Sequence, residues 1–425
     1  MSSYSLLHKK GGHPVLARVI YPAAKLPKSI ARDAPVWMDV HGLSEIVRVA
    51  ADDIFGAYTG YLTFVLHHLS LVTLPMHKGA PLAIPVTRTD QGSCGGNSHG
   101  GGNSIDDSGN NSNGFPLLIF SHGLFGGREM YTSLCQDLAS WGFIVLVIQH
   151  QDGSSPVVVR PDGTRIPYKP LNLVLDEYGE VAYVHARRDQ TDFRVAELAE
   201  VVTYAPRLCE GLGIDLPASS GAIDASRIVL GGHSFGGATV LTYAARHPSL
   251  LRACLVFDPA IDWMPADARD GLMPAYHHGE SPNTETEDPG QEGGIVEGLG
   301  DVPTLFLYSD SWRKAGVGKP LTIRQNVLGR QYGIGSAFAF VDGTSHQSPA
   351  DNMVLLPHWL YHQLGVCSDI PPHESMQQIA MAFSQYALTA CGSSGSNGFS
   401  VAAHSILNHE TPHLSEVVPP TARGR

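Results

Sequence analysis

The stretch GGHSFGG, residues 231–237, decides how the rest of this 425-residue chain can be interpreted. It follows the apolar run SRIVL and precedes ATVLTYAARHP, which has a helical pattern. Its centre fits G-x-S-x-G, in which a serine occupies a sharp turn from a strand to a helix and the flanking glycines avoid steric clashes. The pattern predicts that the Ser234 hydroxyl stands clear of a sheet as a nucleophile. A purely structural glycine-rich turn is the alternative.

Six short apolar runs predict buried strands, and helical patterns separate them. The alternation predicts an α/β fold with a mostly parallel central sheet and helices on both faces. The strand runs are PLLIFS from 116, GFIVLVIQ from 142, SRIVLGG from 226, RACLVFD from 252, VPTLFLY from 302 and SAFAFV from 336. The helical patterns cover 128–141, 192–210, 238–247 and 351–364.

A serine hydroxyl becomes a strong nucleophile only when a base takes its proton and an acid orients that base. In a strand–turn–helix site of this kind, the acid and then the histidine follow the serine along the chain. Asp258 ends the run ACLVFD and is the favoured acid, with Asp262 as its rival. Among 21 histidines, His346 has a preceding strand, turn residues and a following helical pattern in the required order. Asp342 lies close to His346 in the sequence and could be mistaken for the acid, but we expect it to be an ordinary solvated residue of its loop.

The anion that forms on an attacked ester needs backbone N–H donors fixed in advance. The amide of Phe235, next to the serine, is one candidate. The stretch IFSHGLFGG, residues 119–127, ends a strand in a His-Gly turn and makes the amide of Leu124 the second. Such a turn can also bind phosphate at a helix N-terminus, but the chain has no G-x-x-x-x-G-K-[ST] motif.

Composition excludes several classes of protein. A net charge of −12 makes nucleic acid an unsuitable partner, and six widely spaced cysteines predict buried thiols rather than disulfides. The chain has no H-E-x-x-H motif or Cys/His cluster, so we expect no metal and no organic cofactor. The start of the sequence lacks the charged-then-apolar order of a secretory signal, so we expect a cytoplasmic protein. Residues 55–74 are apolar enough to face lipid or an acyl pocket, or to form an ordinary buried helix.

We expect one domain over residues 1–391, with two inserts and a flexible tail at 392–425. In the first insert, 91–114, Gly, Asn and Ser fill 18 of 24 positions, which predicts a disordered surface loop. The second, at about 266–300, has no Lys or Arg between Arg269 and Arg313 and predicts a solvated acidic excursion.

Several motifs resemble, in the same order, those of the platelet-activating factor acetylhydrolases. They are FSHGL, DLASWGFIVLVIQHQD, GGHSFGGATV, LVFD followed closely by WMP, and GTSHQSPAD, and they cover roughly residues 116–351. The resemblance implies an α/β-hydrolase fold and a calcium-independent serine esterase. Its substrate would be a phospholipid whose sn-2 position carries a short or oxidised acyl group, with peripheral contact to membranes or lipid aggregates.

Carried over by motif, the resemblance implies a role for each candidate residue. The chain departs from the family at the second oxyanion donor, where HGLFGGREMY replaces HGLGAFR. Two other functions stay open: a general carboxylesterase or polyester hydrolase with the same three residues, and an inactive hydrolase-fold protein that only binds. The implied roles are Ser234 as nucleophile, Asp258 as acid, His346 as base, and the Leu124 and Phe235 amides as oxyanion hole.

Overall fold

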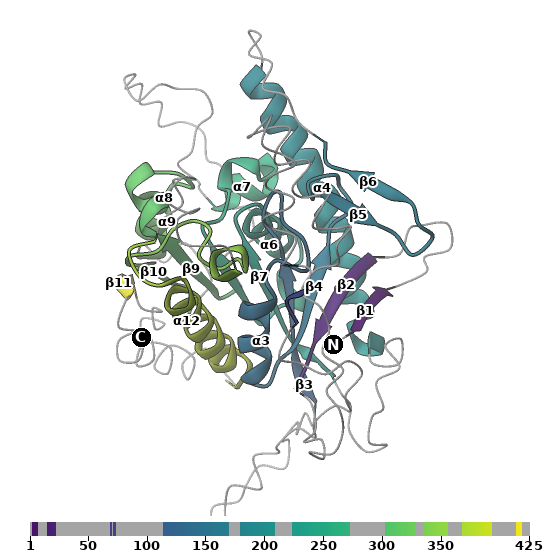
Figure 1. Cartoon of the computed structure of the whole chain (residues 1–425). Helices are drawn as coiled ribbons and strands as arrows, with labels where there is room; N and C mark the ends of the chain where they lie inside the picture. The colour runs from purple at the N-terminus through teal and green to yellow at the C-terminus, as the bar shows by residue number, and fades with distance from the viewer. Residues whose placement is uncertain are drawn as a thin grey trace, which may run out of the picture.

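The structure is a computed structural model, and a nine-stranded sheet forms its centre (Figure 1). It describes residues 2–6, 15–22, 69, 71–73, 114–169, 179–208, 223–272, 302–328, 335–355, 368–392 and 414–418. The strands of the sheet are β1 (Ser2–Leu6), β2 (Val15–Ile20), β3 (Phe115–Ser121), β4 (Ile144–Gln149), β7 (Ile223–His233), β8 (Ala253–Phe257), β9 (Thr304–Ser309), β10 (Ala337–Val341) and β11 (Leu414–Val418).

The strands lie in the order β1-β2-β4-β3-β7-β8-β9-β10-β11. The inner six, from β4 to β10, are parallel, while β1, β2 and β11 pair antiparallel at the two edges. The carboxyl ends of the parallel strands therefore meet at one edge of the sheet. Beside it, β5 (Val157–Val159) and β6 (Arg165–Pro167) form a separate hairpin.

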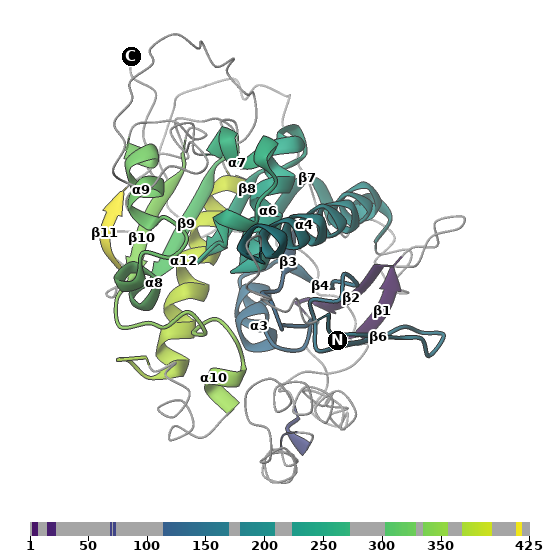
Figure 2. The same cartoon turned by 90° about the horizontal axis from the view of Figure 1, so that it is seen from above.

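Helices cover both faces of the sheet, as the views in Figures 1 and 2 show. In β4, Ile144, Leu146 and Ile148 belong to the core under α4 and α6, whereas Val145 and Val147 belong to the core under α3 and α12. The alternation of strand side chains between two faces explains why these runs are apolar throughout. The helices are α3 (Thr132–Ser140), α4 (Gly179–Tyr204), η5 (Ala205–Arg207), α6 (Phe235–Arg246), η6 (Pro248–Leu250), η7 (Ile261–Trp263), α7 (Ala266–Leu272), α8 (Asp310–Ala315), α9 (Pro320–Leu328), α10 (Asn352–Leu355) and α12 (Pro372–Gly392).

The predicted fold class is confirmed, since the mostly parallel sheet carries helices on both faces. The edge strands β1, β2 and β11 and the long helix α12 add to the prediction. Strand β11 lies inside the tail expected to be flexible, where it pairs with β10. Cys135 and Cys254 are buried free thiols, as predicted.

Several expectations concern residues outside the described ranges. These are nearly all of the insert at 91–114, the second insert beyond α7, and most of residues 55–74. Helix α7 covers the start of the second insert, and the expected acidic excursion beyond it stays a prediction. Within the described ranges, no helix combines the length and apolar character needed to cross a bilayer.

Candidate active site

Ser234 lies between the end of β7 and the start of α6, in a backbone conformation that L-residues rarely adopt (φ 55°, ψ −117°). Two glycines make this turn possible because no Cβ fits at either position. A Cβ on Gly232 would lie 2.4 Å from the Gly236 carbonyl oxygen, and one on Gly236 would lie 1.9 Å from the Ser121 carbonyl oxygen. The turn thus packs α6 directly against the end of β3 and holds the serine at the edge of the sheet.

Asp258 follows β8, the neighbouring strand, and also has a positive φ of 46°. Its amide donates to the Leu307 carbonyl oxygen (2.9 Å). Its buried carboxylate accepts from the Ser309 amide at Oδ1 (2.8 Å) and from the Ser309 hydroxyl at Oδ2 (2.5 Å). Strand β9 therefore fixes the orientation of this carboxylate.

His346 lies in the loop after β10, and its ring connects the other two residues. Nδ1 lies 3.0 Å from Asp258 Oδ2, and Nε2 lies 3.1 Å from Ser234 Oγ. Because a carboxylate only accepts, Nδ1 carries the proton and the Nε2 lone pair faces the serine hydroxyl. The ring stacks on Trp312 (centroids 4.4 Å apart, 12° between planes), and the His346 amide donates to Ser311 Oγ. The imidazole is held in position and in the tautomer that a general base needs.

The two rival carboxylates lie elsewhere. Asp262 is in η7 on the wall of a pocket beside Ser234, and its carbonyl oxygen accepts from Arg188 (3.4 Å). Asp342 accepts from Ser415 Oγ (2.5 Å), and this bond helps to join β11 to the sheet. Asp342 also lies 3.7 Å from Arg313. The structure thus places Asp258, rather than Asp262, beside the histidine.

The pocket has a volume of about 310 Å³, and Ser234 and His346 both line it. Trp263 and Trp312 provide aromatic walls, and Leu124 brings the predicted oxyanion turn to the same space. An ester carbonyl in this pocket would meet the serine, the histidine and the turn together.

The turn after β3 is held by hydrogen bonds on either side of Leu124. The Gly123 amide donates to Tyr131 Oη (3.0 Å), and the Phe125 amide donates to the Ser154 carbonyl oxygen (2.9 Å). Phe125 has a positive φ of 59°. Within the described part of the chain, the Leu124 amide has no hydrogen-bond partner.

The second predicted donor is the amide of Phe235. Phe235 is the first residue of α6, so no carbonyl of that helix can accept from its amide. Both predicted oxyanion donors are available for a ligand.

His122 and His233 are buried next to this turn and stay neutral. Burial and the positive charge of Arg194 lower the pKa of His122 to about 3. Its Nδ1 donates to the Gly123 carbonyl oxygen (2.8 Å), and its Nε2 accepts from the His150 amide (3.3 Å). Burial also lowers the pKa of His233, whose Nδ1 lies 2.8 Å from Tyr131 Oη.

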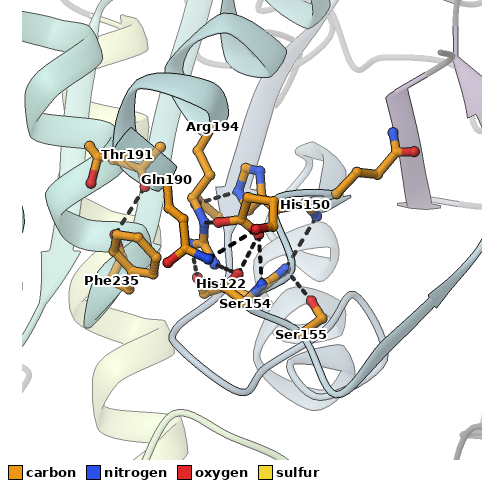
Figure 3. Close-up of polar contacts among 12 residues, drawn as sticks. His122, His150, Ser154, Ser155, Gln190, Thr191, Arg194 and Phe235 are labelled. Atoms are coloured by element: carbon orange, nitrogen blue, oxygen red, sulfur yellow. Dashed lines mark hydrogen bonds and ion pairs between the residues drawn. The ribbon is translucent and has the colours of Figure 1, made fainter. Parts of the chain in front are cut away.

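A buried polar cluster behind the turn was not predicted from the sequence (Figure 3). Arg194 of α4 pairs with Asp152 (2.7 Å). Burial alone would raise the pKa of Asp152, but the guanidinium charge holds that pKa below its usual value. His150 Nδ1 lies 2.6 Å from Glu197 and its Nε2 lies 2.8 Å from Ser121 Oγ. Burial raises the pKa of Glu197 and lowers that of His150, which favours a neutral pair. The sequence signal that could have predicted this cluster is the placement of Arg194 and Glu197 on the apolar face of the predicted helix at 192–210. Among the described residues, no group of His, Cys, Asp and Glu could hold a metal ion.

A strained serine after a central parallel strand, with an aspartate and a histidine at neighbouring strand ends, is the arrangement of the α/β hydrolases. The fold agrees with a solved structure, the ferulic acid esterase from Streptomyces cinnamoneus, at a TM-score of 0.51 and 18% identity, covering 89% of this chain and 83% of that one. At this identity the likeness establishes the fold class alone.

A similarity to a particular family comes from the sequence. Residues 104–268 match the family described as platelet-activating factor acetylhydrolase, isoform II, which confirms the predicted resemblance over that part of the chain. The matched part contains Ser234 and Asp258 but ends before His346.

Individual relatives agree with this match. The platelet-activating factor acetylhydrolase of Cavia porcellus is 31% identical over 167 residues (35% of each chain), and that of Canis lupus familiaris is 33% identical over 138 residues (30% of this chain, 31% of the other). A Schizosaccharomyces pombe protein named "Putative phospholipase A2" is 25% identical over 252 residues (53% and 49%). The match spans about a third of the length of the acetylhydrolases. Together these similarities support a serine hydrolase of the esterase type.

Proposed function

We propose that this protein is a calcium-independent serine esterase that removes a short or oxidised acyl group from the sn-2 position of a phospholipid. The observation that carries the proposal is the hydrogen-bonded chain from Asp258 through His346 to Ser234, with 3.0 and 3.1 Å between the reacting atoms. The names of the acetylhydrolase and phospholipase relatives support the substrate class.

In the proposed reaction, His346 Nε2 takes the hydroxyl proton while Ser234 Oγ forms a bond to the ester carbonyl carbon. The carbonyl oxygen becomes an anion that accepts from the Leu124 and Phe235 amides. When the anion collapses, the ester C–O bond breaks and His346 gives its proton to the leaving lysophospholipid oxygen. Asp258 stabilises the imidazolium throughout. A water, deprotonated by His346, then releases the acyl group as a free acid and restores the serine.

The pocket supports a short acyl group. Its volume of about 310 Å³ lies at the small end of the range of roughly 300 to 1,000 Å³ for ligand sites. Trp263 and Trp312 give it apolar walls, and Val317, which is 45% exposed, also lines it. A long acyl chain would extend beyond this volume.

Hydrolysis of phospholipids with sn-2 chains of graded length tests the proposal. Acetyl and other short chains should be released with the highest kcat/KM, equally with calcium and with EDTA, and Ser234→Ala should abolish the release. Turnover of a simple aryl ester with no release from any phospholipid would assign a general carboxylesterase instead. Hydrolysis of neither substrate by folded protein would favour a binding protein.

A further inference from the structure

The guanidinium of Arg194 makes three hydrogen bonds at the back of the oxyanion turn (Figure 3). It is fully buried and extends from α4. Nε donates to Asp152 Oδ2 (2.7 Å), Nη1 to the His122 carbonyl oxygen (2.8 Å) and Nη2 to Ser154 Oγ (2.5 Å). Each of the three guanidinium nitrogens therefore donates to a different residue.

Two of these bonds fix the turn on either side of Leu124. His122 lies two residues before it, and its carbonyl oxygen accepts directly from Arg194. Ser154 accepts from Arg194 with its hydroxyl, while its carbonyl oxygen accepts from the amide of Phe125, the residue after Leu124. Phe125 has a strained positive φ, so its position depends on outside support. The guanidinium thus spans the peptide that carries one proposed oxyanion donor.

The face of the same guanidinium packs on the side chain of the residue that carries the other donor. Its central carbon lies 4.0 Å from the centroid of the Phe235 ring, and Phe235 is fully buried. The amide of Phe235 is the second proposed donor, next to the nucleophile. One side chain therefore contacts both halves of the proposed oxyanion hole, which come from segments more than 100 residues apart, at Leu124 and Phe235.

We propose that Arg194 is a positioning residue that sets the distance between the Leu124 and Phe235 amides. The inference rests on the proposed function, because only a serine hydrolase needs these two donors. Arginine suits the role because its rigid fork can donate in several directions at once, whereas lysine has a single nitrogen. Asp152 balances the buried charge. The role is indirect: Arg194 does not touch the reacting atoms and works through the turn and the ring.

Arg194→Lys is the decisive variant, measured against Ser154→Ala and against Arg18→Lys as a matched control. Arg18 is also buried, lies on β2, and donates to Thr132 Oγ1 (2.9 Å) rather than to a residue of the turn. The assays are kcat and KM on an ester that the wild-type protein hydrolyses, the pH profile, thermal unfolding, and affinity for a trifluoromethyl ketone. This ketone forms a tetrahedral adduct with the serine, so its affinity measures the oxyanion hole directly.

Displacement of the donors by about 1 Å should lower kcat of Arg194→Lys roughly 100-fold. KM should stay unchanged, the ketone affinity should fall by the same factor as kcat/KM, and the pH profile should keep its shape. Ser154→Ala should lose less, and Arg18→Lys should lose only thermal stability.

The proposal is overturned if folded Arg194→Lys keeps its kcat and ketone affinity, or if Arg18→Lys loses as much activity. If Arg194→Lys does not fold, Ser154→Ala decides: lower kcat with matching loss of ketone affinity supports the proposal, and unchanged values reject it. Inactive wild-type protein, or activity that survives Ser234→Ala, would instead reject the proposed function and this role with it.

Discussion

Replacing Gly236 by alanine tests whether close packing of α6 against β3 builds the site. A Cβ here would lie 1.9 Å from the Ser121 carbonyl oxygen, and ordinary contact begins near 3.4 Å, so the helix and the strand must separate by 3.4 − 1.9 = 1.5 Å. Leu124 follows that strand and Phe235 begins that helix, so their amides move apart. A misplacement of about 1 Å can cost roughly 100-fold. We therefore expect kcat/KM to fall at least about 100-fold, or about 2.7 kcal/mol of transition-state stabilisation.

Gly127→Ala is the matched control, because its Cβ would meet side-chain atoms rather than backbone: the Gln149 side-chain oxygen at 3.1 Å and a Glu129 carboxylate oxygen at 3.4 Å. Steady-state hydrolysis and thermal unfolding of both variants give the comparison. Folded Gly236→Ala with kcat/KM within a few-fold of Gly127→Ala would refute the packing argument.

Three further predictions follow from the site. Asp258→Asn should lower kcat by about 10³ to 10⁴, whereas Asp262→Asn should change it little; steady-state kinetics that reversed this order would move the acid to η7. Ser309→Ala removes the hydroxyl, one of the two donors that Ser309 supplies to Asp258, so kcat should fall about tenfold with KM unchanged; equal kcat values would show that the amide suffices. His122 has a pKa of about 3 in the fold against an ordinary 6.5. The unfolded state therefore binds its proton first, and stability falls as pH drops below 6.5, by about 2 kcal/mol at pH 5. Urea unfolding at pH 7 and pH 5 should show a smaller loss for His122→Gln than for wild type, and equal losses would contradict the burial argument.

The central part of the fold could be predicted because buried parallel strands leave continuous apolar runs. The edges could not, since strand β11 is only five residues long and is held by backbone pairing and by the bond from Ser415 to Asp342. Such long-range contacts leave no local pattern. Helix α12 was not predicted either, although Met376, Ile379 and Phe383 are buried at helical spacing. In this case the apolar spacing that indicates a helix was present in the sequence.

The candidate site divides in the same way. The order of motifs predicted that Ser234, Asp258 and His346 would meet, and the structure brings them within hydrogen-bond distance, while their catalytic roles stay predictions. The contacts of Arg194 could not be predicted, because its partner Asp152 lies 42 residues away and burial alone makes the pair important. A charged residue on a helix is normally expected in solvent.

The most direct test of the account identifies the residue that a fluorophosphonate modifies. Peptide mapping should place the adduct on Ser234, and His346→Ala should slow its formation by at least about 10³-fold. An adduct on another residue, or equally fast labelling without the His346 imidazole, would contradict the claim that this histidine activates this serine.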